Sequence, residues 1–213
     1  MLSLWKGLSK SPVLTDFAWS PLVRSALSQN VAILEPINAV GSLETITSRS
    51  QIPGLVAIHL RRGDYSRHCP RLEKYSSTYM GFNQFPEFPD KFDNRKFQDH
   101  DERIEYYMAH CYPTVAQVAQ KLMAVRTQNP GLKRVYVMTN GWGGWLRELR
   151  QILLSDGWED VKNSVDMQLD MVQKHVAMAV DMAIAEKAEV FVGNGVSFAQ
   201  ALILPQTDFY FAM

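Results

Sequence analysis

One histidine and two arginines follow a short apolar run and could together hold a phosphate group. Residues 55–58 (Leu-Val-Ala-Ile) favour a β-strand that is buried on both faces. His59, Arg61 and Arg62 come where that strand should end, and open α/β sheets bind ligands outside the carboxyl ends of their strands. The planar fork of an arginine can donate to a pair of phosphate oxygens at once. Because Gly63 also allows the backbone a sharp turn, the segment predicts a local anion site.

The same residues allow other interpretations. Arg61 and Arg62 could belong to a plain turn in solvent, with an internal ion pair, that binds nothing. The tripeptide Arg62-Gly63-Asp64 matches the adhesion motif read by integrins, but no other feature of the sequence indicates an adhesion module. Successive strand residues point to opposite sides, so we expect Arg61 to enter the ligand crevice and Arg62 to form a structural ion pair.

Length and composition restrict the classes of partner. The 213 residues, 46% of them hydrophobic, suffice to bury the core of one large α/β domain or two small ones. Lys+Arg and Asp+Glu are both 22, so no overall basic field favours nucleic acid, and a small anion is the expected partner. No stretch approaches the roughly 20 apolar residues of a membrane span, and the first residues lack a signal-peptide hydrophobic region. We therefore expect no nucleic-acid partner and no membrane span in this chain.

The cysteines, Cys69 and Cys111, each follow a histidine. This repeated pair suggests a zinc site, but zinc sites usually show close ligand pairs, and adjacent residues in an extended segment point to opposite sides. A disulfide in an oxidising compartment and a pair of buried free thiols are both compatible with the sequence.

Strand and helix patterns alternate along the chain. Ser20 as N-cap and Pro21 at the first helical position predict a short helix through Gln29, and residues 31–34 suggest a short strand. Residues 66–101, rich in aromatic residues and proline, are typical of a long loop. Further helices are predicted over 102–127 with a break at Pro113, over 142–154 and over 168–187, and further strands over 134–139 and 189–193.

This alternation predicts the fold class. Strands that alternate with helices form a parallel sheet covered on both faces. We therefore expect an α/β, Rossmann-like, three-layer domain with a mostly parallel sheet over residues 54–213, preceded by an N-terminal extension over residues 1–53.

Three segments in order resemble a known family. They are residues 59–64 (His-Leu-Arg-Arg-Gly-Asp), residues 135–140 ending in Thr139 and Asn140, and Asp181 followed by residues 190–197 (Val-Phe-Val-Gly-Asn-Gly-Val-Ser). Together they resemble the donor-binding half of the O-fucosyltransferase-like glycosyltransferases, particularly the fungal members, over about residues 54 to 204. The resemblance implies a GT-B architecture, in which two Rossmann-like halves face each other and the C-terminal half binds GDP-fucose.

The resemblance also implies roles for individual residues. The arginine matching Arg61 is catalytic, because it contacts the β-phosphate and helps GDP depart, and the histidine matching His59 lies at the same diphosphate. Asp181 matches an aspartate near the guanine, and Ser197 matches a phosphate-binding hydroxyl at a helix N-terminus. Alternatively, Asp181 is a helix-surface or capping aspartate, and Ser197 only an N-cap. Further expected contacts with the donor are Phe198, Arg62, Asp64, Thr139, Asn140 and Asn194.

Reaction type and location are likewise implied by the resemblance. It implies an inverting reaction with GDP-fucose as donor substrate, with no cofactor and no divalent metal, since cationic side chains take the metal's role. It also implies the lumen of the endoplasmic reticulum or Golgi, where a disulfide between Cys69 and Cys111 would persist.

The sequence also departs from the family pattern. Ser197 is followed by Phe198-Ala199-Gln200 instead of a second hydroxyl residue, so we expect one phosphate contact to be missing. Only 58 residues precede His59, which leads us to treat residues 1–53 as a remnant of the N-terminal half, and no catalytic base is identified. The sequence is compatible with fucosyl transfer to a protein or glycan hydroxyl, or with a nucleotide-sugar-binding module without transferase activity.

Overall fold

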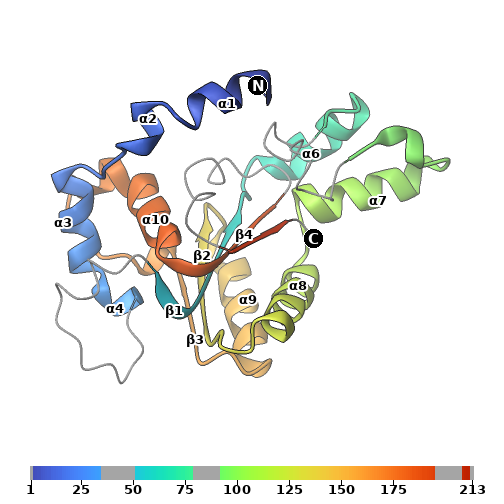
Figure 1. The fold of residues 1–213 in the computed structure, drawn as a ribbon. Coiled ribbons are helices and arrows are strands. Elements are labelled where there is room, and N and C mark those ends of the chain that lie inside the picture. Colours follow the sequence, from blue (N-terminus) through green and yellow to red (C-terminus); the bar gives the residue numbers. More distant parts are fainter. Residues whose placement is uncertain (1, 35–50, 79–91, 195–207, 212–213) are drawn as a thin grey trace.

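The computed structural model describes residues 2–34, 51–78, 92–194 and 208–211. Figure 1 shows a sheet flanked by helices, with one helical lobe that projects from it. The strands are β1 (Ile52–Leu60), β2 (Arg134–Thr139), β3 (Asp160–Asn163), β4 (Ala188–Gly193) and β5 (Asp208–Phe211). The α-helices are α1 (Leu2–Leu8), α2 (Pro12–Thr15), α3 (Pro21–Gln29), α4 (Val31–Leu34), α6 (Tyr65–Lys74), α7 (His100–Cys111), α8 (Val115–Gln128), α9 (Gly143–Ser155) and α10 (Ala177–Glu186). Short 3₁₀ helices are η2 (Asn94–Lys96), η3 (Ser164–Asp166) and η4 (Gln173–Val176).

All described strands run parallel in one sheet, in the order β3-β2-β1-β4-β5. β1 lies at the centre, and His59 in it is paired with Met138 of β2 and with Gly193 of β4. From β1 the chain proceeds outward through β2 and β3, and then returns to place β4 on the other side of β1. The strand order therefore reverses between β1 and β4, which is the point where open α/β sheets bind their ligands.

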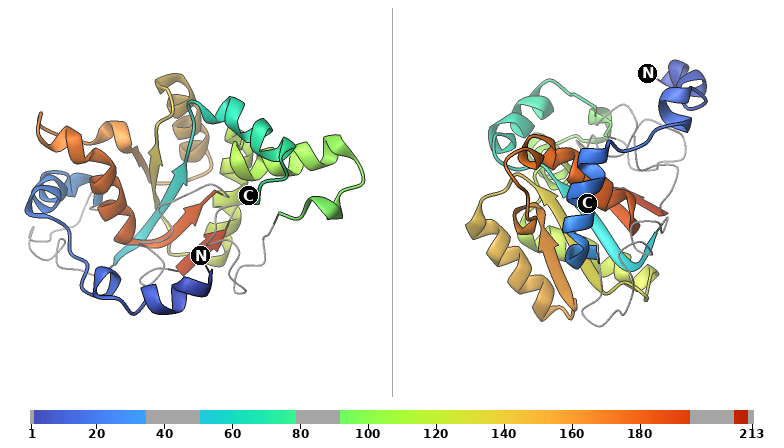
Figure 2. Two further views of the ribbon diagram at one scale, coloured as in Figure 1. Left: turned by 90° about the horizontal axis from the view of Figure 1, so that it is seen from above. Right: turned by 90° about the vertical axis from the view of Figure 1, so that its left-hand side faces the viewer.

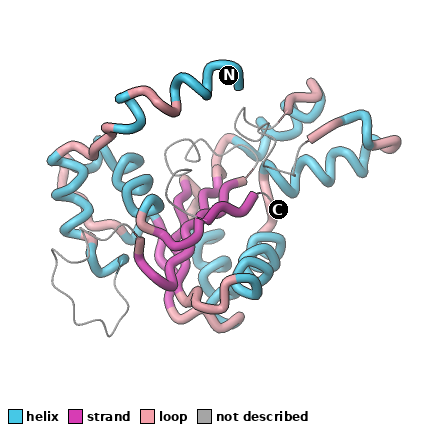
Figure 3. The backbone as a smooth tube through the Cα atoms, viewed as in Figure 1, coloured by secondary structure: helices cyan, strands magenta, loops and turns pink. Residues whose placement is uncertain are grey.

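The sheet separates two apolar cores, because alternate strand residues face opposite sides. α3, α4 and α10 cover one face, and α8 and α9 cover the other (Figures 2 and 3). The first core contains Leu55, Ala57, Tyr136, Met138 and Phe191 from the strands. The second contains Val56, Ile58, Leu60, Val135, Val137, Val161, Val190 and Val192. The predicted three-layer α/β architecture with a parallel sheet is confirmed.

Residues of α3 and α4, which precede the sheet in the sequence, pack into the first apolar core. Val23, Ala26 and Leu27 of α3 are buried against α10 and the strands, as are Val31 and Ile33 of α4. The predicted division at residue 54 falls inside β1, and it stays a prediction as a domain boundary. In the described part of the chain, no helix is both long and apolar enough to cross a membrane.

Several predicted elements are confirmed by local signals. α3 begins at Pro21, and the Ser20 side chain accepts a hydrogen bond from the N–H of Val23. The predicted break at Pro113 separates α7 from α8, where Thr114 and Gln117 form a capping box. β2, β4 and α9 lie within a residue of their predicted bounds.

Other predicted elements are wrong, and tertiary contacts explain why. Residues 31–34 form α4 rather than a strand, because the Asn30 carbonyl accepts from Ile33 and continues a helical path. The helix predicted from residue 168 begins only at Ala177, since the Asp170 carboxylate accepts from two backbone N–H groups and holds a turn there.

The predicted loop over residues 66–101 is wrong at residues 66–74, 94–96 and 100–101, which are helical. It contains α6, which tolerates Pro70 in its interior, as well as η2 and the first turn of α7. Residues 79–91 of that predicted loop lie outside the described residues. The sequence pattern also missed β3, which is short and buries Val161 and Asn163 between polar neighbours.

α6 and α7 form the projecting lobe, which has its own small core. Cys69 of α6 and Cys111 of α7 are joined by a disulfide and are fully buried beside Phe92 and Tyr107. The disulfide prediction is thus confirmed, and the zinc and free-thiol alternatives are wrong. The covalent bridge therefore ties α6 directly to α7 and restricts the unfolded chain.

Replacing both Cys69 and Cys111 by serine should lower the free energy of unfolding by about 2 to 4 kcal/mol, because the bridge restricts the unfolded chain. Chemical denaturation under oxidising conditions measures this difference. As a matched control, the reduced wild-type protein should fall to the stability of the double variant, whereas reductant should leave the variant unchanged. Equal stability of oxidised and reduced wild type would contradict the prediction.

Candidate functional site

The carboxyl ends of β1, β2 and β4 bring the predicted site residues to one edge of the sheet. Arg61 directly follows β1, Thr139 ends β2, and Asn194 directly follows β4. The β1 and β4 ends border the point where the strand order reverses. A ligand crevice is therefore expected between residues 61 and 194.

Arg61 leaves β1 with its side chain 40% exposed. Its Nη2 atom lies 3.2 Å from Oδ1 of Asp64, whose side chain is 64% exposed, and its guanidinium carbon lies 5.3 Å from the centre of the Tyr65 ring. An ion pair as open as this is weak in water and yields readily to a stronger anion. The Arg61 Nε atom is buried and makes no hydrogen bond within the described part of the chain. Arg61 is thus oriented but not locked in a buried carboxylate pair.

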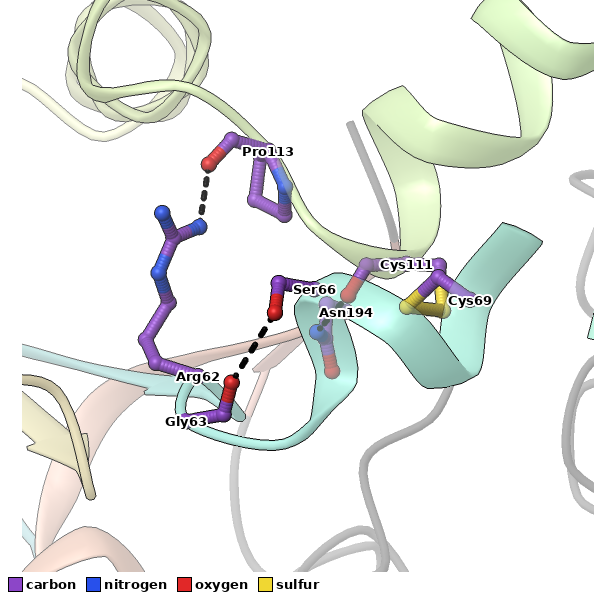
Figure 4. Close-up of a disulfide and its surroundings, with 7 residues drawn as sticks. All are labelled: Arg62, Gly63, Ser66, Cys69, Cys111, Pro113 and Asn194. Atoms are coloured by element: carbon purple, nitrogen blue, oxygen red, sulfur yellow. Dashed lines mark hydrogen bonds between the residues drawn. A yellow bond between two sulfur atoms is a disulfide. The ribbon is translucent and has the colours of Figure 1, made fainter. Parts of the chain in front are cut away.

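Arg62 lies in a different environment, between the end of α7 and the first turn of α9. It is 4% exposed, and its guanidinium carbon lies 3.7 Å from the centre of the Tyr112 ring and 4.4 Å from that of Trp145. Its Nη1 atom donates to the Pro113 carbonyl at 2.5 Å (Figure 4), and burial lowers its pKa. The predicted structural ion pair is wrong, because an aromatic cage and a carbonyl oxygen hold this cation instead. The prediction that the two arginines diverge is confirmed.

The turn after β1 is shaped by the end of β2. The Asn140 Oδ1 atom accepts from the Arg62 backbone N–H at 2.8 Å, and the Thr139 hydroxyl donates to the Leu60 carbonyl at 2.6 Å. Gly63 has a φ of +55°, and a Cβ atom there would lie 2.9 Å from the Asn140 side-chain nitrogen. A larger residue would therefore be strained at this position. Thr139 and Asn140 set the direction in which Arg61 leaves the strand, and direct ligand contacts by them stay a prediction.

His59 carries no charge at neutral pH. Burial, and then the positive charge of Arg61, lowers its pKa to about 4. A neutral imidazole can donate one hydrogen bond and accept another, but it does not add positive charge. Arg61 is therefore the cation that this strand end offers to an anion.

Asp181 of α10 is held by two donors from other elements. The Tyr136 hydroxyl donates to its Oδ1 atom at 2.5 Å, and the Ser164 hydroxyl lies 2.9 Å from both carboxylate oxygens. Burial raises the pKa of Asp181 to about 6, although both hydrogen bonds act in the opposite direction. Asp181 is thus neither a free helix-surface residue nor a cap. A buried carboxyl group with a raised pKa is typical of functional sites.

Sequence reasoning missed the residues around Asp181 and Arg62. Tyr136 carried a usable signal, because strand alternation places it on the same sheet face as Leu55 and Ala57. Ser164 carried none, since it follows the unpredicted strand β3. Tyr112 and Trp145 resembled ordinary core aromatics.

Asn194 ties the end of β4 to the α6–α7 lobe. Its Nδ2 atom donates to the Cys111 carbonyl at 3.1 Å, and it is 1% exposed (Figure 4). Its Oδ1 atom is buried and makes no hydrogen bond in the described ranges. Ser197 and Phe198, predicted to follow in the site, lie outside the described residues.

The described residues also form surface cavities. One of about 600 Å³ lies between α7 and α8 and is lined in part by Glu105, Met108 and Gln117. Another of about 600 Å³ lies near Trp19 and Lys187, where the Trp19 indole donates to Glu186. Among the described residues, no cluster of three or more His, Cys, Asp or Glu side chains could hold a metal ion.

A parallel sheet with this strand order, covered by helices on both faces, defines the Rossmann-like class of α/β domains. The family model for GDP-fucose protein O-fucosyltransferases matches residues 25–210. Since this match spans most of the sequence, the chain belongs to the GDP-fucose protein O-fucosyltransferase family.

A solved structure is similar in fold. It is the crystal structure of POFUT1 in complex with GDP-fucose, with a TM-score of 0.56 and 16% sequence identity. The likeness covers 92% of this chain and 47% of the POFUT1 chain, so this chain spans about half the length of that protein. At this identity the likeness establishes the fold. A search of curated proteins returned no match.

The raised pKa of Asp181 has a consequence for stability. The value of about 6 lies above the ordinary carboxyl value of about 3.9, so the folded protein holds this proton more tightly than the unfolded chain does. Ionisation of Asp181 therefore destabilises the fold as the pH rises toward and through 6. Asp181→Asn removes this effect, because the amide stays neutral.

We expect the stability of Asp181→Asn relative to wild type to rise by roughly 2 to 3 kcal/mol between pH 4 and pH 7.5. Urea denaturation across this pH range measures the difference. Asp101→Asn, which changes an exposed aspartate, is the matched control and should show no such trend. A constant difference between Asp181→Asn and wild type would refute the prediction.

Proposed function

We propose that this domain binds GDP-fucose at the carboxyl edge of the sheet and serves fucosyl transfer to a hydroxyl group of a protein or glycan. The observation that carries the proposal is the partly exposed side chain of Arg61, which stands where the strand order reverses and, among the described residues, forms an ion pair only with the exposed Asp64. Membership of the GDP-fucose protein O-fucosyltransferase family supports the choice of donor.

Arg61 is the proposed catalytic residue. Breaking the bond between fucose and the β-phosphate builds negative charge on the departing GDP, and a fixed guanidinium stabilises that charge more in the transition state than in the ground state. His59, neutral because its pKa is about 4, donates a hydrogen bond to the same diphosphate. We propose an inverting reaction without a divalent metal, in which the acceptor oxygen attacks from the side opposite to GDP.

Asp181 is the proposed base-recognition residue. An ionised carboxylate can accept parallel hydrogen bonds from the N1–H and the N2 amino group of guanine. Uracil offers no such pair of adjacent donors, so a UDP-sugar would leave the carboxylate without those bonds. Ser197 and Phe198 remain proposed contacts with the donor, and Ser197 would bind phosphate.

The wider setting is also a proposal. We propose that the domain is the donor half of a GT-B architecture, and that it works in the lumen of the endoplasmic reticulum or Golgi. The buried Cys69–Cys111 disulfide supports an oxidising compartment.

A second candidate function is a nucleotide-sugar-binding module without transferase activity. The observation that favours it is the 16% identity to POFUT1, at which the likeness extends to the fold and not to the activity. Donor binding would be common to both candidates, and acceptor-dependent turnover separates them.

Arg61→Ala should weaken GDP binding by roughly 1.5 to 3 kcal/mol, because a charge-assisted hydrogen bond to phosphate is lost. Its thermal stability should stay close to wild type, since Arg61 is half exposed. Isothermal titration with GDP, GDP-fucose, GDP-mannose and UDP-sugars, together with thermal melting, measures both effects.

Two arginine controls make this test specific. Arg67→Ala removes the same charge from the exposed face of α6 and should leave binding unchanged. Arg62→Ala should instead lower the melting temperature, because it empties the cage of Tyr112 and Trp145. If Arg61→Ala bound GDP like wild type, Arg61 would not be the phosphate ligand.

Residues 1–213 by themselves should bind GDP-fucose yet transfer fucose poorly. Holding both reactants in a reactive orientation can lower the activation barrier by roughly 7 to 11 kcal/mol. None of the described residues is assigned to binding the acceptor, so we expect this contribution to be small. A transfer assay on peptide and glycan acceptors, run beside a GDP-release assay, checks this expectation. Strong acceptor-dependent turnover would show that the chain alone is a complete catalyst.

A further inference from the structure

Tyr136, Ser164 and Asp181 form a polar cluster on the α10 side of the sheet, in which Tyr136 is buried and the other two side chains are partly buried. The donors come from β2 and η3, whereas the carboxylate comes from α10. A carboxylate on a helix can rotate about its side-chain bonds, but hydroxyl groups from two separate elements restrict it to one orientation. Tyr136 is fully buried, so its hydroxyl cannot replace the hydrogen bond to Asp181 with one to bulk water.

The cluster is connected to the strand end that carries Arg61. The Ser164 hydroxyl accepts from the Thr139 backbone N–H at 3.0 Å, and the Thr139 hydroxyl donates to the Leu60 carbonyl. Hydrogen bonds thus link the Asp181 carboxylate, through the end of β2, to the last residue of β1. The orientations of the Asp181 carboxylate and of the turn at Arg61 therefore both depend on the hydrogen bonds of Ser164 and Thr139.

The charge on Asp181 is finely balanced in this cluster. Burial favours the neutral acid, whereas the hydrogen bonds from Tyr136 and Ser164 favour the carboxylate, and the resulting pKa is about 6. The negative charge of Asp166 in η3 raises the pKa of the Tyr136 hydroxyl. The elements around α10 carry other titratable or charged groups: Arg24 of α3, His59 of β1, Glu189 of β4, and Lys174 and His175 of η4.

The protonation state matters because the two forms of the side chain offer different hydrogen bonds. An ionised carboxylate only accepts, and its lone pairs not used by Tyr136 and Ser164 can meet a pair of N–H donors on a base. The protonated acid carries an O–H donor, which opposes one of those N–H groups. The ionised form of Asp181 can therefore accept both N–H groups of a base, and the protonated form cannot.

We propose that Tyr136 and Ser164 are positioning residues that keep Asp181 ionised and oriented for the nucleotide base, so that donor binding by this domain weakens as the solution becomes mildly acidic. This inference rests on the proposed function, because it concerns the same donor site. It assigns a regulatory property, sensitivity to pH, to two hydroxyl groups that contact no ligand themselves.

The first experiment measures the dissociation constant of GDP-fucose between pH 4.5 and pH 8.5. A GDP-sugar is the suitable probe because its phosphates are both esterified and bind no proton in this range, unlike the terminal phosphate of GDP. Wild type should bind about tenfold more weakly at pH 5 than at pH 7.5, since one pH unit below a pKa leaves about one tenth of the group ionised.

Tyr136→Phe should move the midpoint of this profile upward by about one pH unit, because the ionised form loses a hydrogen bond. Its affinity at pH 7 should fall about twofold and recover at pH 8.5. Ser164→Ala should also move the midpoint upward. Ser164→Thr, which retains the hydroxyl, should keep the midpoint at the wild-type pH. Tyr107→Phe, a buried tyrosine of the α6–α7 lobe, is the matched control and should leave the midpoint in place.

Histidines titrate in the same range, so a second measurement identifies the group. Carboxyl ¹³C resonances report the ionisation of Asp181 directly in protein without nucleotide, and Asp181→Asn identifies its signal. The Asp181 resonance should titrate near pH 6 and shift upward in Tyr136→Phe. In Asp181→Asn the binding profile should lose its midpoint near pH 6.

The outcomes separate this inference from the proposed function. Absence of GDP-fucose binding at every pH would overturn the proposed function. Binding with a midpoint that Tyr136→Phe does not move, or an Asp181 resonance that does not titrate near pH 6, would overturn the inference alone.

Discussion

The central position of β1 is the constraint on which the rest of this structure depends. Its residues are buried on both faces, so successive side chains must enter different layers. The alternation continues past the end of the strand, where Arg62 enters the cage of Tyr112 and Trp145 and Arg61 stays half exposed. A buried, caged arginine thereby anchors the turn that presents its neighbour to a ligand.

The α6–α7 lobe depends on that anchor as well. Three contacts converge on the link between α7 and α8: the disulfide at Cys111, the bond from Asn194 to the Cys111 carbonyl, and the bond from Arg62 to the Pro113 carbonyl. They join α6, the end of β4 and the end of β1 to one short segment (Figure 4). A lobe with a small apolar core is thus held rigidly beside the edge where the donor is proposed to bind.

Asp181 illustrates the opposition between stability and function in this fold. An apolar side chain in its place would suit the core under α10, whereas the buried carboxyl group resists ionisation and needs donors from two other elements. Proteins retain such groups where a ligand requires them. The placement of Asp181 on the sheet face that carries Tyr136, and its connection to the end of β1, are consistent with a role at the donor site.

The sequence by itself determined the features that depend on neighbouring residues. The apolar run before His59, the cap at Ser20 and Pro21, the break at Pro113 and the alternation of strands with helices each reflect local backbone preferences, and all are present in the structure. Only the tertiary structure decided the partners of Arg62 and Asp181, because those contacts join separate elements, whereas periodicity reports on one element at a time. It also decided that residues 31–34 are helical, since a short apolar run satisfies a strand or a helix equally well until its neighbours supply the hydrogen bonds and the core.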